Sequence, residues 1–331
     1  MRYSIFSVVD HYPTRSRAVA DYYAQLFRTT AVAEQLGYEA AFVAEHHFHE
    51  YGAVPNPAVM LAALARQTAR IRLGPAISTL TYHNPLMVAE SYAMVDVLSG
   101  GRLVLGTGSG YLKHEFAGFG IPPEEKRQRF DETLMLMRRL LAGERVTYEG
   151  AYHRLDGVAL NVRPIQQPTP PIYVAALARE ASYHIGRQGN RLMAIPYATA
   201  GAFTELGDLQ QGFRRGRAEG GHPPDDNDSI YTFHCYVADT DEEARVHAAR
   251  PFDLYVETRL YARRQTYDDV MASGLALFGS VDTVARKVVE LERMGIPHIA
   301  LLMDFGLMPE EWVLRSMRLF AEDVMPRVRA A

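Results

Sequence analysis

The amino-acid sequence predicts an α/β protein, a TIM-like (β/α)₈ barrel in which each of eight parallel strands is followed by a helix. Short β-branched or aliphatic runs alternate with longer amphipathic stretches along the chain, as in repeated strand–helix units. Hydrophobic residues make up 48% and charged residues 22% of the 331 residues, which suits a large core. Because no linker is long enough to mark a boundary, residues 1–331 are expected to form a single domain.

Each element follows from a local pattern. Asn56-Pro57 starts a helix, since Asn caps helix N-termini and the missing N–H of Pro costs nothing at the first helical position. Other helices are expected at residues 16–35, 86–98, 124–141 and 309–324. The eight strands are expected at residues 3–9, 40–44, 71–77, 103–107, 172–176, 191–195, 230–238 and 298–303.

Two segments depart from the simple alternation. Residues 146–155 alternate polar and apolar side chains around Gly150, which predicts a β-hairpin insertion after the fourth helix. Residues 250–280 form a long connection before the last strand. A connection of this length is either additional helix or a lid-like insertion over the barrel mouth, and the residues do not distinguish the two.

Charge and cysteine content exclude several classes. A net charge of −4 gives no reason to expect a nucleic-acid partner, and the basic residues 213–217 are expected to be the exposed end of a helix. No apolar run approaches the roughly 18 residues of a membrane span, and no signal-like segment opens the chain, so a cytoplasmic protein without a membrane partner is expected. The single cysteine, Cys235, lies in a strand and is expected to be buried.

The carboxyl ends of barrel strands carry the functional residues of such folds. After the second strand, residues 44–50 contain three histidines and two carboxylates. His47 and His49 could share a metal ion, with Asp10, His11 and Asp304 as further ligands. The histidines could instead transfer protons, or simply form hydrogen bonds with the backbone.

The next strand ends are rich in small residues. Gly74 and Ala76, and then Gly106, Gly108 and Gly110, permit either close approach of a flat ligand or tight packing in a crowded barrel. Tyr111 occupies the position where a dinucleotide-binding fingerprint needs glycine. After the fifth strand, small residues lead into a helix N-terminus suited to a phosphate, where Arg179 supplies countercharge or points into solvent.

Taken in order, these segments resemble the bacterial luciferase-like flavin-dependent monooxygenases. The match covers nearly the whole chain except residues 200–275 or so. It is strongest from Ala44 to Pro57. The other matching segments are residues 70–74, 89–90, 96–103, 110–111, 115–116, 119–120, 164–166, 170–175 and 279–280.

The resemblance implies a monooxygenase that takes reduced FMN from a separate flavin reductase. One oxygen atom of O₂ would enter a small organic substrate through a flavin hydroperoxide, and the protein would be a homodimer. His46 would face the reactive side of the flavin, with Glu45 and His47 supporting it. Many relatives carry Arg at position 109, so Ser109 puts the phosphate clamp in doubt, and Arg179 is the candidate replacement. The implied cofactor contacts are Ala76, Ile77 (joined by a cis peptide bond), Glu90, Gly108, Ser109, Tyr111, Ala178, Arg179 and Ser182.

Three alternatives remain at this stage. A deazaflavin-dependent oxidoreductase shares the barrel. A flavin-binding subunit without turnover would need the same cofactor contacts. A metal-dependent hydrolase would use His47 and His49.

Overall fold

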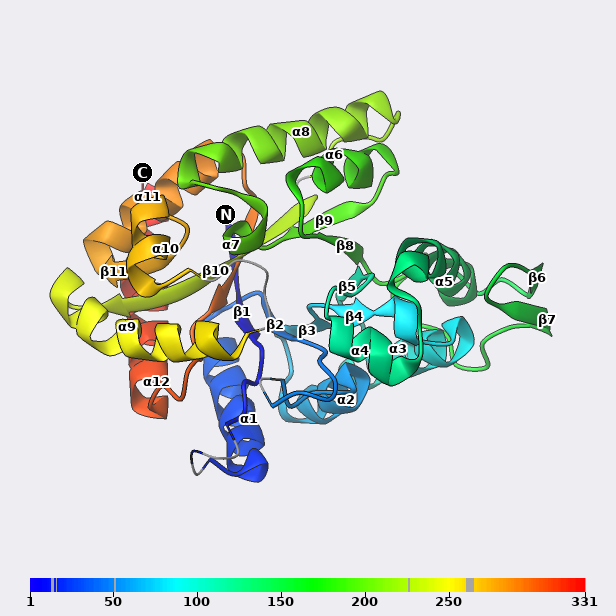
Figure 1. Ribbon diagram of the computed structural model, residues 1–331, viewed down its shortest axis with the longest axis horizontal. Coiled ribbons are helices and arrows are strands. Elements are labelled where there is room, and N and C mark those ends of the chain that lie inside the picture. Colours follow the sequence, from blue (N-terminus) through cyan, green and yellow to red (C-terminus); the bar gives the residue numbers. More distant parts are fainter. Residues whose placement is uncertain (13–14, 16, 51, 226, 260–264, 331) are drawn as a thin grey trace.

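The computed structural model describes residues 1–12, 15, 17–50, 52–225, 227–259 and 265–330. Its main sheet is a nearly closed parallel barrel with the strand order β3-β2-β1-β12-β10-β9-β8-β5-β4 (Figure 1). β3 and β4 are successive parts of one barrel stave, and a bridge between Leu73 and Leu103 joins this stave to the next. The predicted (β/α)₈ barrel is therefore confirmed. The strands of this sheet are β1 (Arg2–Ser7), β2 (Ala40–Val43), β3 (Arg72–Pro75), β4 (Ser78–Thr79), β5 (Leu105–Gly108), β8 (Ile172–Ala176), β9 (Arg191–Ala194), β10 (Ser229–Ala238), β11 (Leu277–Ser280) and β12 (His298–Leu302).

Helices surround the barrel, and the start of α2 follows the expected capping chemistry. The side chain of Asn56 accepts a hydrogen bond from the backbone N–H of Val59, as a capping residue does. No helix in the described part of the chain combines the length and apolarity that crossing a bilayer requires. The helices are α1 (Val19–Gln35), α2 (Pro57–Gln67), α3 (Pro85–Ser99), α4 (Lys113–Phe119), α5 (Lys126–Leu141), α6 (Arg179–Arg187), α7 (Pro196–Thr199), α8 (Leu206–Glu219), α9 (Asp241–Thr258), α10 (Tyr267–Ser273), α11 (Val281–Arg293), α12 (Glu310–Leu319) and α13 (Met325–Ala330).

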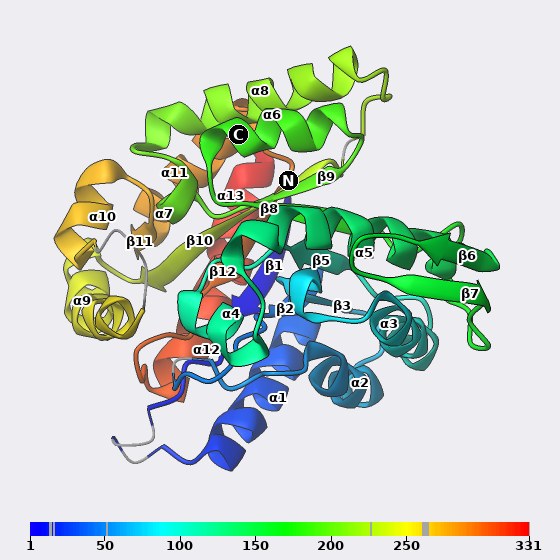
Figure 2. The same ribbon diagram turned by 45° about the vertical axis from the view of Figure 1, so that its right-hand side comes forward.

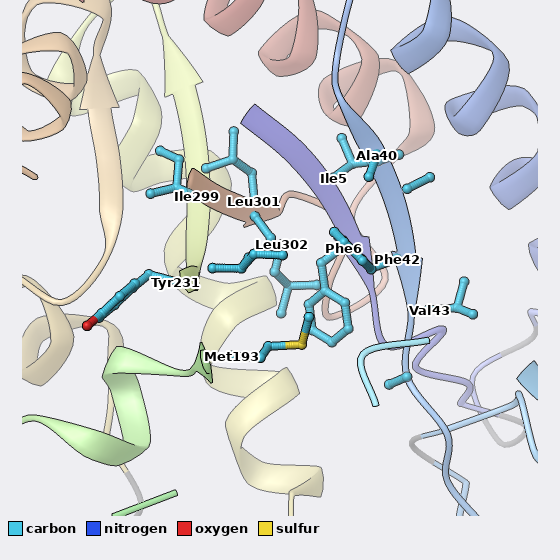
Figure 3. Packing of buried hydrophobic residues seen from close by; sticks show 14 of the residues in the cluster. Ile5, Phe6, Ala40, Phe42, Val43, Met193, Tyr231, Ile299, Leu301 and Leu302 are labelled. Atoms are coloured by element: carbon cyan, nitrogen blue, oxygen red, sulfur yellow. The ribbon is translucent and has the colours of Figure 1, made fainter. Parts of the chain in front are cut away.

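The barrel interior is filled by large apolar side chains. β12 lies between β1 and β10 and is buried along its whole length, as expected of a strand covered on both faces. Phe6, Met193 and Leu302 come from three different strands and point toward one another inside the barrel (Figure 3). These three side chains also form the floor of the cavity described below.

An antiparallel pair occupies the position of the expected hairpin. β6 (Val146–Glu149) and β7 (Arg154–Val158) project beside α5, away from the barrel (Figures 1 and 2). The Glu132 carboxylate on α5 accepts hydrogen bonds from the backbone N–H groups of Tyr152 and His153. The turn of the hairpin is thereby fixed to the helix.

The connection at residues 250–280 is more regular than its sequence suggested. It contains the end of α9, α10 and the short strand β11, which pairs with β10. β11 was not predicted, because its four residues include a glycine and lack the length of a clear strand. Residues 260–264, the centre of the expected lid, lie outside the described residues.

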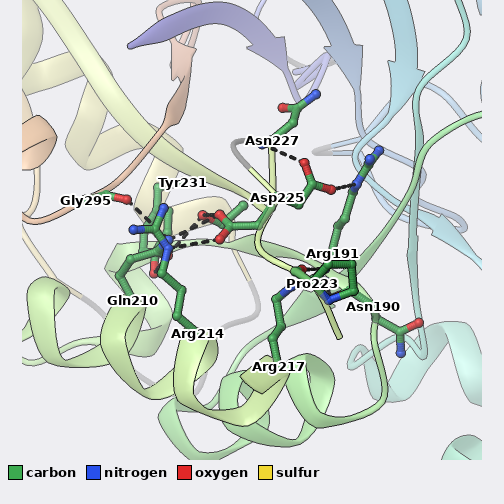
Figure 4. A network of polar contacts seen from close by, with 12 residues as sticks. Asn190, Arg191, Gln210, Arg214, Arg217, Pro223, Asp225, Asn227, Tyr231 and Gly295 are labelled. Atoms are coloured by element: carbon green, nitrogen blue, oxygen red, sulfur yellow. Dashed lines mark hydrogen bonds and ion pairs between the residues drawn. The ribbon is translucent and has the colours of Figure 1, made fainter. Parts of the chain in front are cut away.

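The expectation for the basic cluster at residues 213–217 is confirmed for Arg214 and Arg215, which are exposed near the end of α8, but it is wrong for Arg217. Arg217 on α8 is buried and donates to the backbone carbonyls of Gly189, Asn190 and Pro223 (Figure 4). Arg214 pairs with the buried Asp228 carboxylate at 3.0 Å. Arg217 thus lies between α8 and the loops that follow α6 and α8, so at this position α8 is structural.

Candidate active site

A cavity of about 290 Å³ opens at the carboxyl ends of the barrel strands, where (β/α)₈ enzymes place their sites. Its lining is mainly apolar, with a few converging polar groups, which is the usual character of small-molecule sites. The predicted site residues that line it are Glu45, His46, Ala76, Ile77, Gly108, Ser109, Tyr111 and Ala178. Four others do not: His47, Glu90, Arg179 and Ser182.

His46 is held by a carboxylate from a distant segment. Its Nδ1 lies 3.2 Å from Oε1 of Glu115 on α4, and the same oxygen accepts the backbone N–H of His47 at 2.9 Å. Gly52 packs against the His46 side chain, so a Cβ at position 52 would overlap it. Burial holds the pKa of His46 below its ordinary value, because Glu115 offsets only part of the desolvation. His46 is therefore a neutral imidazole near neutral pH, with the Nδ1 proton directed at Glu115.

Glu45 is the centre of a second buried network. Its Oε1 lies 3.1 Å from Nε2 of His47 and 2.9 Å from Nε2 of His83, and its Oε2 accepts the Ser78 hydroxyl. Burial opposes ionisation, but the hydrogen bonds from the two histidines bring the pKa of Glu45 to about 2. Burial alone would lower the pKa of His83, yet the bond to Glu45 raises it. His47 thus supports Glu45 from outside the cavity wall.

The arrangement of these histidines does not match a metal centre. Nε2 of His47 is engaged with Glu45, and the His49 ring packs against His114 at 5.4 Å. In the described ranges, no group of three or more His, Cys, Asp and Glu side chains is arranged to hold a metal ion. The hydrolase alternative finds no support in this geometry.

One wall of the cavity is built from small residues. The Ala76-Ile77 peptide bond is cis, as the family resemblance implied. A Cβ on Gly108 would overlap the Ile77 side chain, and one on Gly74 would overlap a backbone carbonyl of the next strand. Crowding between strands therefore explains Gly74. Of the three alternating glycines, Gly110 alone has a positive φ, at 75°.

The polar end of the cavity differs from the expected phosphate site. Arg179 points toward α8, 3.4 Å from Asp208, and Ser182 Oγ donates to the backbone carbonyl of Arg179. Lys126 and Arg127, at the start of α5, line the cavity instead. From sequence, Lys126 and Arg127 were predicted only to belong to a helix, because nothing local shows that α5 begins beside the barrel mouth.

Glu90 lies elsewhere. It is half-buried on α3, which packs against α2 and α5. It does not reach the cavity, since a helix of the surrounding layer is separated from the barrel interior by the strands.

Further residues line the cavity that were not predicted as site residues. Glu115 was noted only as part of a matching segment, and its partner His46 is 69 positions away. Thr232 and His234 on β10, and Tyr255 and Arg259 at the end of α9, also line the cavity. These four lie in the region with least resemblance to the family, where no motif marks them.

Comparisons with known proteins agree with this geometry. The family model described as luciferase-like monooxygenase matches residues 1–298. A monooxygenase of solved structure from Streptomyces bottropensis is 31% identical, with a TM-score of 0.91 over 100% of both chains. The oxygenating constituent of 3,6-diketocamphane monooxygenase from Pseudomonas putida, a type II Baeyer-Villiger enzyme solved with FMN, is 20% identical, with a TM-score of 0.85 over 98% of both chains.

A relative named for another cofactor is about as similar in sequence as the Streptomyces bottropensis monooxygenase. The F420-dependent glucose-6-phosphate dehydrogenase of Intrasporangium calvum is 30% identical over 92% of this chain and 95% of its own length. The family thus includes flavin- and F420-dependent oxidoreductases. With the family match extending through the barrel and its carboxyl-end cavity, the chain belongs to the luciferase-like monooxygenase family and is an oxidoreductase.

Proposed function

We propose that the protein is an FMN-dependent monooxygenase that receives reduced FMN from a separate flavin reductase. The observation that carries the proposal is His46, fixed by Glu115 at the wall of a largely apolar cavity that six of the predicted flavin contacts also line. The diketocamphane enzyme, with FMN bound and the same fold, supports this choice of cofactor.

The residues present fit FMN. Ala76, Gly108 and Ala178 leave a flat wall against which a planar ring system can lie. Lys126 and Arg127 place two cations at the cavity edge, and cations favour phosphate. Lys126 and Arg127 would bind the phosphate in place of the arginine that many relatives carry where this chain has Ser109. Reduced FMN, when bound, supplies the two electrons by which one atom of O₂ enters the substrate and the other leaves as water.

The chain itself would manage protons and water. Neutral His46, with its Nδ1 proton directed at Glu115, presents Nε2 as an acceptor and can hold a proton there. Phe6, Met193 and Leu302 keep the floor of the cavity apolar, which excludes water from the reacting groups.

The cofactor proposal is tested by titrating the purified protein with FMN and with riboflavin, following flavin fluorescence. We expect FMN to bind more tightly, and Lys126→Ala/Arg127→Ala to weaken FMN binding by about tenfold or more without changing riboflavin binding. Arg179→Ala is the matched control and should leave both affinities unchanged, since Arg179 pairs with Asp208 outside the cavity. Equal binding of the two flavins by the wild type would contradict the assignment of the cationic end.

F420 is the second candidate, supported by the name of the Intrasporangium relative. Titration with F420 in the same assay decides between them, since the proposed function requires tighter binding of FMN. A flavin-binding subunit without turnover is distinguished by an assay in which a flavin reductase and NADH supply reduced FMN to the protein. Such a subunit would oxygenate no organic substrate, and His46→Ala would have no effect on this result.

We also propose a homodimer. Exposed apolar side chains lie on α2 and α3, including Val59, Met87 and Met94, each at least half exposed. A group of apolar side chains in water is typical of an interface between subunits. Light scattering should give twice the mass of one chain for the wild type, and one chain's mass for Met87→Glu/Met94→Glu. A monomeric wild type would contradict the dimer.

A further inference from the structure

One end of the cavity carries polar groups that the proposed cofactor contacts do not use. Thr232 and His234 stand two positions apart on β10, so both side chains point into the barrel. Tyr255 and Arg259 are four positions apart at the end of α9 and face the same space. This group is called the β10–α9 end below.

His234 is buried without a hydrogen-bond partner. Only 3% of its surface is exposed, and within the described part of the chain neither Nδ1 nor Nε2 makes a hydrogen bond. Aromatic rings surround it: Phe252 at 5.0 Å, Tyr255 at 5.3 Å and Tyr197 at 5.6 Å between centroids. A buried polar group left unsatisfied costs about 1–3 kcal/mol, so a histidine in this position calls for a function.

The protonation state of His234 fixes what it can offer. Burial, and then the charge of Arg259, hold the pKa of His234 well below its ordinary value. The ring is therefore neutral and presents one N–H donor and one acceptor nitrogen. Its aromatic neighbours hold it in place without satisfying either.

Arg259 brings a positive charge to the same end. It is 6% exposed, and its guanidinium carbon lies 4.1 Å above the Tyr255 ring. The β10–α9 end thus combines a stacked cation and an imidazole with an apolar floor.

We propose that the β10–α9 end binds the substrate through an ionised oxygen, a carboxylate or a phenolate, on an apolar body. The guanidinium of Arg259 pairs with this oxygen, and the N–H of His234 donates to it. Phe6, Met193 and Leu302 contact the apolar part. The assignment rests on the proposed function, because it presupposes that flavin occupies the wall of small residues opposite.

The test is equilibrium binding of simple probes, with and without oxidised FMN. The probes are benzoate, its neutral isostere benzamide, and 4-nitrophenolate, whose absorbance shifts on binding in mildly alkaline buffer. The wild type should bind the anions at least about tenfold more tightly than benzamide, as a charge-assisted hydrogen bond implies. Benzoate and 4-nitrophenolate compared with each other show which kind of ionised oxygen is preferred.

Variants assign the effect to residues. Arg259→Gln should remove the preference for anions and leave benzamide binding unchanged, while Arg259→Lys should retain part of it. His234→Asn, which keeps a donor, should bind anions better than His234→Leu. Arg179→Gln is the control, a cation outside the cavity, and should behave as wild type. Circular dichroism and melting temperature show whether each variant is folded. If Arg259→Gln or His234→Leu does not fold, the conservative variants Arg259→Lys and His234→Asn decide the test.

The outcomes separate this inference from the proposed function. If FMN binds but anions bind no better than benzamide, the β10–α9 assignment is overturned and the cofactor proposal stands. If Arg259→Gln weakens FMN binding as much as benzoate binding, Arg259 serves the flavin and the assignment is also overturned. If FMN does not bind at all, the proposed function fails, while the titrations without FMN still decide the anion site.

Discussion

Replacing Glu45 by Gln tests whether the buried histidine network stabilises the fold through charge. The pKa of Glu45 is about 2, against an ordinary value of 4.5, because His47 and His83 donate to it. The difference of 2.5 units corresponds to about 3 kcal/mol of stability. For a depressed carboxyl pKa, this contribution is complete above about pH 4.5 and is lost as the pH falls toward 2.

Near neutral pH, Glu45→Gln should therefore lower the free energy of unfolding by about 3 kcal/mol. With an unfolding entropy of about 0.7 kcal/mol/K for 331 residues, this is a melting temperature roughly 4 °C lower. The gap between variant and wild type should narrow once the pH falls below about 4.5, because the wild type then loses the same contribution. Glu149→Gln, on the exposed hairpin strand, is the control and should have no effect at any pH.

A second measurement isolates the partner. Burial alone lowers the pKa of His83, and only the bond to Glu45 raises it. In Glu45→Gln, NMR titration of the His83 ring should therefore give a lower pKa than in the wild type. A stability loss that is the same at every pH, or an unchanged His83 titration, would show that packing rather than charge holds this network.

Two further predictions concern groups outside the network. Burial, with a contribution from Asp10, raises the pKa of Asp304 to about 7. For a raised carboxyl pKa, the folded protein loses stability as the pH rises from about 4 to about 7. In urea denaturation, the free energy of unfolding of Asp304→Asn should therefore match that of the wild type near pH 4 and exceed it by up to about 4 kcal/mol above pH 7. A difference that is the same at every pH would refute this titration of Asp304. Arg217→Ala should lower the free energy of unfolding by about 3 kcal/mol in the same assay, because three carbonyl groups in the loops that follow α6 and α8 lose their donor. The exposed Arg215→Ala should cost almost nothing. Equal effects of the two substitutions would mean that Arg217 is not structural.

The barrel could be predicted because its signals are local. Alternating strand and helix patterns, and caps such as Asn56, depend on residues a few positions apart, and these predictions correspond to observed elements. β11 was missed because it is short and gains its stability from pairing with β10. Arg217 was misread for a related reason: its neighbours in sequence are polar, but in space it donates to backbone carbonyls of the loops that follow α6 and α8.

The candidate site was predicted only in part. Glu45, His46 and the wall of small residues lie in segments whose composition is unusual in itself. Glu115 belongs to a segment that resembles the family, but nothing local predicts its partner, and it meets His46 from 69 positions away only in the folded barrel. The same holds for Lys126, whose position at the cavity depends on where α5 begins rather than on its own sequence context.

The two cavity histidines show how surroundings divide one residue type between two tasks. His46 has a carboxylate at 3.2 Å, whereas His234 has aromatic rings and no hydrogen-bond partner among the described residues. Burial is the main cause that lowers the pKa of each ring, and the charge of Arg259 lowers both further. An anion paired with Arg259 would cancel part of that charge, so the pKa of His46 would rise when substrate binds. Recognition at the β10–α9 end would then favour a proton on His46, and the cavity would couple occupancy to acid–base chemistry without any movement of the backbone.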